Sequence, residues 1–381
     1  MKKASALIIT LFFLLLPLRC AAEALEGALR DTMDNLPLQD WQRAYESAFP
    51  EGESLSQVVL LLARGEQVMD AEGLLSSLFH ELMAAVGGSL WRISRLIAPA
   101  VFCGVAQRLR GAFSRQSLAE ALSGACFLLL CGCMAQDLSQ HMALCKGAVE
   151  RISDLMQSLF PLLLTLLAAV GGTAGAAFFQ PAVVAASGTM TTLIHSVTLP
   201  LALSAGVISI LNHLSPKIHL SRLSSLLESA ASWTLGIGFT VFISVTTLQS
   251  FGAAAADGVS IRTAKYAVDH FVPVVGGMVA DTMDTLVGAS LLIKNALGIT
   301  GLMALVSISA APMAQTLAGV FLYRACAALL QPLSDERFSI CLQDFSNILM
   351  LLFVIQLSVG AMFLLLVAQM LVVGNLTVMF R

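Results

Sequence analysis

The sequence predicts an all-α, polytopic membrane protein with six to eight spans, preceded by a cleavable signal peptide and a short acidic helical region. Of its 381 residues, 57% are hydrophobic and 12% are charged, against about 45–50% and about 25% in soluble domains. Strand-like alternation is absent, and three Trp and three Tyr are too few for the aromatic girdles of a membrane β-barrel. With a net charge of −3, the chain also lacks the basic surface of a nucleic-acid-binding protein.

Residues 1–24 have the three parts of a secretory signal peptide. Lys2 and Lys3 precede an apolar run over 4–18, and small residues follow as far as Ala24. The run is shorter than the about 20 residues that cross a bilayer. We therefore predict a cleaved signal peptide, with an uncleaved first span as the alternative. The residues after the cleavage site would then begin on the extracytoplasmic side of the membrane.

Residues 25–81 are predicted to form an acidic, extracytoplasmic helical region. Twelve Asp or Glu and three Arg lie between Ala21 and Glu81, which gives a balance of −9. Pro50 and Gly52 divide the region into at least two helical pieces, and Ser54 is a candidate N-cap for the second. Because charge runs are usually solvated, we favour a solvated segment that only precedes the membrane domain. A docking surface for a partner is the alternative.

Residues 82–381 are predicted to form the membrane domain. Asp, Glu, Lys and Arg are absent from 155–216, 229–256, 295–323 and 345–380. At about 20 residues per span, the first run has room for two or three crossings and each of the others for one. Residues 121–136 form a shorter candidate, and 96–106 spans only if Arg92 and Arg95 snorkel to the interface.

Glycine and proline interrupt the longest charge-free run, at Gly171, Gly172, Gly175 and Pro181. Such breaks within small-residue sequence fit either a re-entrant pair or two short helices that pack closely. Basic residues cluster in 108–115 and 217–222. The positive-inside rule places both loops in the cytoplasm, so an even number of crossings must separate them.

Polar residues within the apolar sequence are the candidates for chemistry. Asp281 and Asp284 lie on one helix face because of their i,i+3 spacing, and Lys294 and Asn295 follow. Charges inside a membrane are costly and are usually functional, so these residues are candidates for a pore lining or an interface. The competing interpretation, which we favour, is an interfacial or pore-facing amphipathic helix, because the uncharged pieces on either side are short.

No catalytic constellation is visible in the sequence. The eight Cys lie mostly in apolar segments, and neither they nor the six His have metal-ligand spacing. Nucleotide-binding and hydrolase motifs are also absent. We therefore predict a non-enzymatic protein with no cofactor and no metal, for which another protein supplies any energy that is used.

One block resembles a known family. The stretch KYAVDHFVPVVGG over 265–277 continues through Asp281 and Asp284 to LLIKNALG over 291–298. It closely resembles a block of the stage III sporulation protein AE family of endospore-forming bacteria. Shorter blocks at 179–183, 214–217, 257–265 and 331–335 also fit. The resemblance covers almost the whole chain and is weakest before about residue 90, and the long block is its specific part.

The resemblance implies a location and partners that the residues alone do not. Proteins of this family lie in the mother-cell membrane that surrounds the forespore, within an assembly of several membrane subunits and a separate ATPase. The assembly joins a forespore-side channel protein across the intermembrane space. It is needed for late forespore transcription. The family has no established catalytic residues.

Within the long block, five residues are candidates for a loop or packing motif: Lys265, Asp269, Pro273, Gly276 and Gly277. The acidic region would face the space between the two membranes.

Two classes of function follow. The first is a membrane platform or channel subunit of the sporulation complex, which is expected to be oligomeric and to bind no nucleic acid. The second is a stand-alone secondary transporter that uses Asp281 and Asp284, for which the broken spans give support and the absent internal symmetry counts against it. A scaffold that only positions other subunits is a third interpretation.

Overall fold

A computed structural model describes residues 27–34, 36–49, 54–65, 116–214, 220–271, 276–332 and 336–379, and scattered positions between 73 and 102. The signal peptide and most of 66–115, including Arg92, Arg95 and Arg108, lie outside this description. All regular structure in the described ranges is helical, and no strand occurs in them. The predicted all-α class is therefore confirmed.

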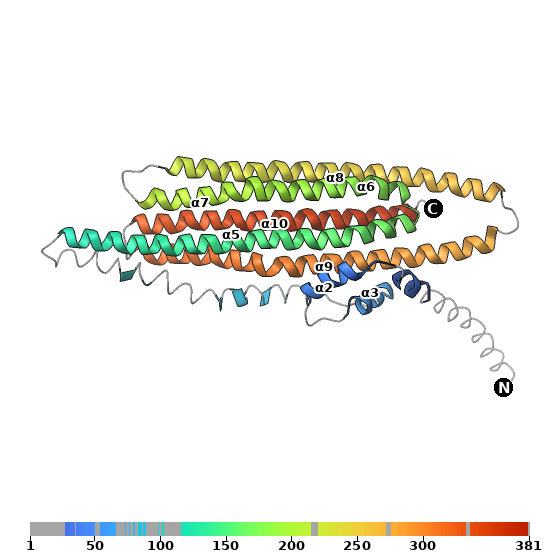
Figure 1. Cartoon of the computed structure of the whole chain (residues 1–381), viewed down its shortest axis with the longest axis horizontal. Helices are drawn as coiled ribbons and strands as arrows, with labels where there is room; N and C mark the ends of the chain where they lie inside the picture. Colours follow the sequence, from blue (N-terminus) through green and yellow to red (C-terminus); the bar gives the residue numbers. More distant parts are fainter. Residues whose placement is uncertain are drawn as a thin grey trace, which may run out of the picture.

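The bundle consists of five long helical rods (Figure 1). They are α5 (Gln116–Ala169), the continuous run of α6 (Thr173–Leu193), η2 (Ile194–Thr198) and α7 (Leu199–Leu214), α8 (Ser221–Phe271), α9 (Gly276–Leu330) and α10 (Glu336–Met379). Helix α10 packs against α5, α7, α8 and α9, whereas α8 packs against α6, α7 and α10. One continuous apolar core connects the rods.

Specific contacts fix the relative depth of the rods. Cys145 Sγ of α5 donates to Leu352 O of α10, and Cys341 Sγ donates to Met134 Sδ, both across a separation of 207 residues. Helices α5 and α10 are therefore parallel, and a residue of α5 lies level with the residue of α10 whose number is 207 higher. Helix α9 is antiparallel to α10, because Lys294 meets Leu371 and Arg324 meets Ser346.

Five helical segments in the described ranges are long and apolar enough to cross a membrane: Gly124–Ala169, Ser187–His213, Ser221–Asp257, Leu286–Leu330 and Glu336–Leu376. This confirms a polytopic membrane protein. Six to eight spans stay a prediction for the whole chain, since most of 66–115 is not described. Helix α9 has 55 residues and is about 80 Å long, against about 30 Å of hydrocarbon, so the rods extend beyond the bilayer.

The predicted break in the longest apolar run lies at Gly171 and Gly172. Helix α5 ends at Ala169, Gly171 adopts φ 102°, and Gly172 N–H donates back to Leu167 O at 2.9 Å. A left-handed residue of this kind ends a helix and reverses the chain. Helices α5 and α6 pack side by side, which agrees with the alternative of two packed helices, although both are longer than expected. Pro181, in contrast, lies inside α6 without ending it.

A π-helical turn joins α6 to α7. The turn η2 begins at Ile194 and ends at Thr198, and Leu199 N–H donates to Ile194 O. Pro200 comes two residues after the turn and has no N–H for the carbonyl of Ser196, and a wider turn upstream relieves such a mismatch. The chain therefore passes through this position without a loop.

The N-terminal region lies against the bundle. Helices α2 (Gln39–Ala48) and α3 (Leu55–Ala63) pack on α9, and α2 also packs on α5. Trp41 and Val59 are fully buried in this contact. The predicted division near Pro50 is confirmed. The predicted side-chain cap is wrong: Ser54 occupies the N-cap position, but its Oγ lies 3.4 Å from Ser56 Oγ and caps no backbone group.

Gly206 allows α7 to approach α5 and α10 closely. A Cβ at this position would lie 2.8 Å from Leu138 Cδ2 and 3.2 Å from Ile348 Cγ2. We expect Gly206→Leu to lower stability by about 1–3 kcal/mol through overpacking, measured as thermal unfolding of the purified protein in detergent. Gly132→Leu is the matched control, because Gly132 of α5 has open space around it. Equal stability of the two variants would contradict this packing.

Candidate functional site

Polar contacts between the helices are the candidates for functional chemistry in the bundle. In the described ranges, no group of three or more His, Cys, Asp or Glu is placed to hold a metal ion. The cysteines described there are free, and all except the half-buried Cys133 are buried. Polar side chains within a membrane bundle commonly hold helices together or line a polar path. Each polar contact is therefore a candidate for one of these roles.

Lys294 and Asn295 connect α9 to α10. The Lys294 side chain is completely buried, and its Nζ donates to Leu371 O at 3.2 Å. Gly374 provides the space for this ammonium group, since a Cβ there would overlap Lys294 Nζ. One residue further along, Asn295 Nδ2 donates to Asn375 Oδ1 at 3.2 Å. The structure thus places these two predicted site residues in one helix–helix contact.

The remaining predicted site residues lie at the turn between α8 and α9. Lys265 and Asp269 belong to the last turns of α8, and Gly276 and Gly277 begin α9. Pro273 lies between the helices and outside the described residues. Asp281 and Asp284 follow in the first turns of α9, and their side chains also lie outside the description. The long sequence block therefore forms the end of the α8–α9 hairpin.

This hairpin end projects beyond the other helices (Figure 1). Helix α8 continues for 14 residues after Asp257, and α9 begins 18 residues before Lys294. At about 1.5 Å per residue, the two arms extend about 20–27 Å past these contacts. Helix α10 ends at Met379, only five residues after Gly374. We call residues 258–285 the hairpin tip.

Asp257 supplies a polar contact that sequence reasoning missed. Its side chain is completely buried, and Oδ1 accepts a hydrogen bond from Gly175 N at 2.9 Å. Gly175 lies in the first turn of α6, where the free N–H groups and the helix dipole favour an anion. A Cβ at Gly175 would collide with the Asp257 carboxylate. Two sequence features could have indicated this contact. Asp257 directly follows the charge-free run 229–256, and the Gly-rich break at 171–175 leaves space for a side chain from another helix.

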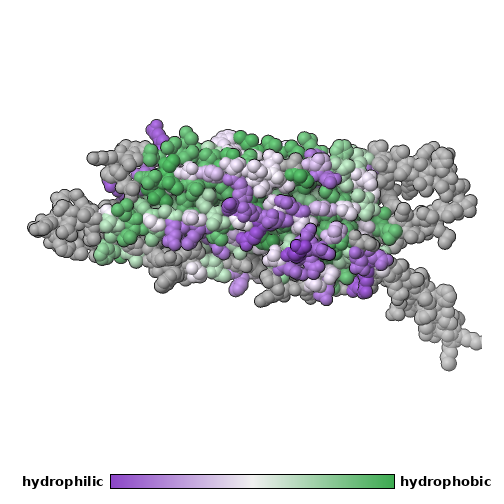
Figure 2. All heavy atoms as spheres, in the orientation of Figure 1, coloured by the Kyte–Doolittle hydropathy of each residue, from purple (hydrophilic) through white to green (hydrophobic). Residues whose placement is uncertain are grey.

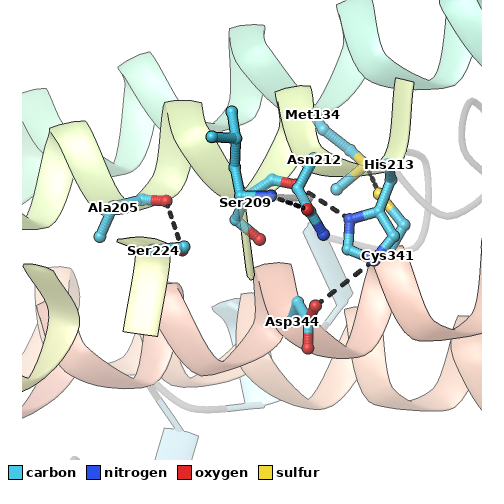
Figure 3. Close-up of polar contacts among 9 residues, drawn as sticks. Met134, Ala205, Ser209, Asn212, His213, Ser224, Cys341 and Asp344 are labelled. Carbon is cyan, nitrogen blue, oxygen red and sulfur yellow. Dashed lines mark hydrogen bonds and ion pairs between the residues drawn. The ribbon is translucent and has the colours of Figure 1, made fainter. Parts of the chain in front are cut away.

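The junction of α7, α8 and α10 contains a further polar cluster (Figure 3). His213 Nδ1 lies 2.9 Å from Ser209 O, and His213 Nε2 lies 3.5 Å from Asp344 Oδ2 of α10. Asn212 Oδ1 accepts from Leu220 N at 2.7 Å and thus holds the start of α8. The sequence indicated only a basic loop here. The pairing with Asp344 was missed, because a lone carboxylate beside a charge-free run gives no indication of its partner.

Two more contacts connect α9 to its neighbours at one level. Tyr323 Oη donates to Asp137 Oδ2 of α5 at 2.7 Å, and Arg324 Nε donates to Ser346 Oγ of α10 at 3.2 Å. The Tyr323 ring also packs on Phe345, with ring centroids 4.5 Å apart. With the Lys294 contact, α9 is therefore fixed near both ends of its apolar run. These contacts hold α9 against α5 and α10 at two levels.

The Lys294–Gly374 contact predicts a non-additive pair of substitutions. Gly374→Ala should destabilise the protein, because its Cβ occupies the position of the buried ammonium group. In a Lys294→Ala background the same change should have little effect, so a double-mutant cycle on thermal unfolding should give a coupling of about 0.5–3 kcal/mol. Gly360→Ala on the same helix, where the space is open, is the control. Additive effects would rule out the contact.

The Asp257–Gly175 contact predicts a graded series. Asp257→Ala leaves the buried Gly175 N–H without this acceptor and should cost about 1–3 kcal/mol. Asp257→Asn keeps an acceptor oxygen and should retain part of that stability. Thermal unfolding in detergent measures both variants, and a loss as large for Asn as for Ala would show that the hydrogen bond is unimportant.

Comparison with known proteins confirms the family resemblance over most of the chain. The family model described as "Stage III sporulation protein AE" matches residues 54–374. The chain is 33% identical over 310 residues to "Stage III sporulation protein AE" of Bacillus subtilis (strain 168), covering 81% of this chain and 77% of that protein. No solved structure matches the chain. The match spans α3, the hairpin tip and the five rods except for the last five residues of α10, and the chain therefore belongs to the stage III sporulation protein AE family.

Proposed function

We propose that the protein is a non-enzymatic, multi-pass subunit of a complex that connects the mother cell to the forespore. The observation that carries the proposal is a bundle of long apolar helices in a chain that belongs to a stage III sporulation family. As such a subunit, either platform or channel, it would be required for late forespore gene expression and spore development. It would lie in the mother-cell membrane around the forespore. Its N-terminal region would start on the extracytoplasmic side and fold back along the bundle, where α2 packs on α9 and α5.

The hairpin tip is the proposed docking surface for partners. It carries the most family-specific part of the sequence, with Lys265, Asp269, Asp281 and Asp284 within about 20 residues. It extends past the rest of the bundle, so a partner can reach it without entering the bilayer. The expected partners at the tip are other membrane subunits and the forespore-side channel protein, because the 217–222 loop, predicted to be cytoplasmic, lies at the other end of α8. The separate ATPase is the expected partner on the cytoplasmic side. Several copies of this chain would take part in the assembly.

Substitution of the tip carboxylates tests this proposal. In the sporulating native organism, Asp281→Asn together with Asp284→Asn should reduce late forespore reporter expression and the number of heat-resistant spores. Glu336→Gln, an exposed carboxylate at the opposite end of the bundle, should leave both unchanged. Normal spores from the double variant would exclude a role for these carboxylates.

Co-purification tests membership of the complex. A tag after Arg381, with mild detergent extraction from sporulating cells, should recover the partner ATPase and other membrane subunits. The double carboxylate variant should recover less of them at equal expression. Recovery of the protein alone would favour the stand-alone transporter, for which flux through liposomes is the next measurement.

A further inference from the structure

The outer face of α5 exposes no large apolar side chain over a length greater than the thickness of a membrane. From 132 to 169, every exposed residue of α5 is charged, polar, or one of Gly, Ala and Pro. Its centre carries Lys146, Glu150, Arg151 and Asp154, all exposed. These 38 residues extend about 55 Å, against about 30 Å of hydrocarbon. We call this surface the α5 face.

The charges lie at the depth where the rest of the bundle is most apolar. The constant offset between α5 and α10 places Lys146–Asp154 beside residues 353–361 of α10, in the middle of its charge-free run. Helix α8 is parallel to α10, since Phe242 packs on Phe363 and Ser250 donates to Gln369. At the same depth α8 therefore exposes Trp233 and Ile237, with 72% and 58% of their surfaces accessible.

Helix α8 has the surface of a lipid-facing helix. Only 22% of its most apolar window is buried in the protein, against 44–56% in the other four candidate spans. Helices α5 and α8 both pack on α6, α7 and α10, whereas α5 also packs on α9 and α8 lies at one margin of the bundle (Figure 1). At one depth in the membrane, the bundle thus has a charged surface on α5 and an apolar surface on α8.

The N-terminal helix α2 gives independent support for contact between water and the α5 side of the bundle. Gly301 of α9 faces Leu159 of α5 and Gly319 faces His141, which places Ser307 about level with Ser153. Ser307 Oγ donates to Ala48 O at the end of α2. Helix α2 exposes a charged pair, Asp40 and Arg43, with side chains 78% and 75% accessible. Hydrophilic residues accordingly gather across the middle of the visible face in Figure 2.

The charged groups of the α5 face interact within their own helix. Lys146 Nζ lies 3.8 Å from Glu150 Oε1, and Arg151 Nε donates to Gly147 O at 3.2 Å. All four charged residues are exposed, so their remaining donor and acceptor groups are accessible at the surface. A hollow of about 450 Å³ beside Arg151, closed on the α9 side by Gln315, gives room for water. Hydrocarbon satisfies none of these groups, so lipid is excluded as their neighbour.

We propose that the α5 face is the hydrated wall of a conduit through the membrane, with the α8 face toward lipid. This inference rests on the proposed function and deepens it, because it assigns the chain to the channel rather than to a platform beside it. Two cations alternate with two anions on the wall, so it repels neither sign of charge. The expected cargo class is therefore small polar solutes of either charge. Further subunits would close the lumen.

Cysteine reactivity tests the wall directly. In a variant with Ser at the eight native Cys positions, Ala143→Cys, Asp154→Cys and Gln157→Cys report on α5. Trp233→Cys and Ile237→Cys are controls at the same depth on α8, and Ile152→Cys is a buried control. A charged, membrane-impermeant maleimide should label the α5 positions about tenfold or more faster than the controls, because thiolates form in water and not in hydrocarbon. An uncharged maleimide after denaturation confirms that every thiol is present.

The comparison is made in native membranes, first without the partner proteins and then in sporulating cells. Slow labelling of the α5 positions in the first experiment would overturn the hydrated wall. Labelling that is lost only in sporulating cells would show a dry interface with a partner, which also overturns the conduit. Counts of heat-resistant spores are read separately, so fast labelling with unimpaired sporulation after gene deletion would reject the proposed function and leave the wall intact.

Discussion

The bundle depends on the requirement that polar groups in hydrocarbon find partners within the protein. The backbone meets it through helices that continue without a loop for 44–55 residues in α5, α8, α9 and α10. Exposed hydroxyls on α8 meet it by donating to the carbonyl four residues earlier, as Thr240 does to Gly236 and Ser244 to Thr240. Side chains that cannot bond locally, such as Lys294 and Tyr323, bond to a neighbouring helix. The same requirement gives the charged α5 face its significance, because its charged side chains are exposed and, among the described residues, bond only within α5.

Glycine is the residue that makes the buried charges compatible with close packing. The Lys294 ammonium group fills the space over Gly374, and the Asp257 carboxylate fills the space over Gly175. In each pair the charge reaches a backbone group of the opposing helix, a carbonyl in one case and an amide in the other. A charge and a glycine that are far apart in sequence thus act as one unit, so neither residue tolerates a change without the other.

The sequence predicted the class and the chain reversals better than the contacts. Charge-free runs identify apolar helices because each crossing must lack charges, and Gly171 is visible because only glycine readily adopts a positive φ. Helix lengths were underestimated, since α5 continues through Gln136 and the charged 146–154 into the next apolar run as one helix. The pairings of Tyr323 with Asp137 and of His213 with Asp344 were beyond reach, because nothing local specifies a partner more than 100 residues away. The α5 face was within reach: polar residues recur at 139, 146, 150, 154 and 157, which fits helical spacing.

The π-helical turn at 194–198 determines how the two parts of its rod are phased. Each residue turns an α-helix by about 100°, so the extra residue accommodated in this turn rotates α7 relative to α6 by that angle. Because of this rotation, Ala202, Ala205 and Gly206 face the core while the buried residues of α6 face α5 and α8. The turn therefore sets the rotation of α7 about the axis that it shares with α6. A deletion of one residue within the turn would rotate α7 by about 100° and move all of its core-facing residues away from their neighbours at once.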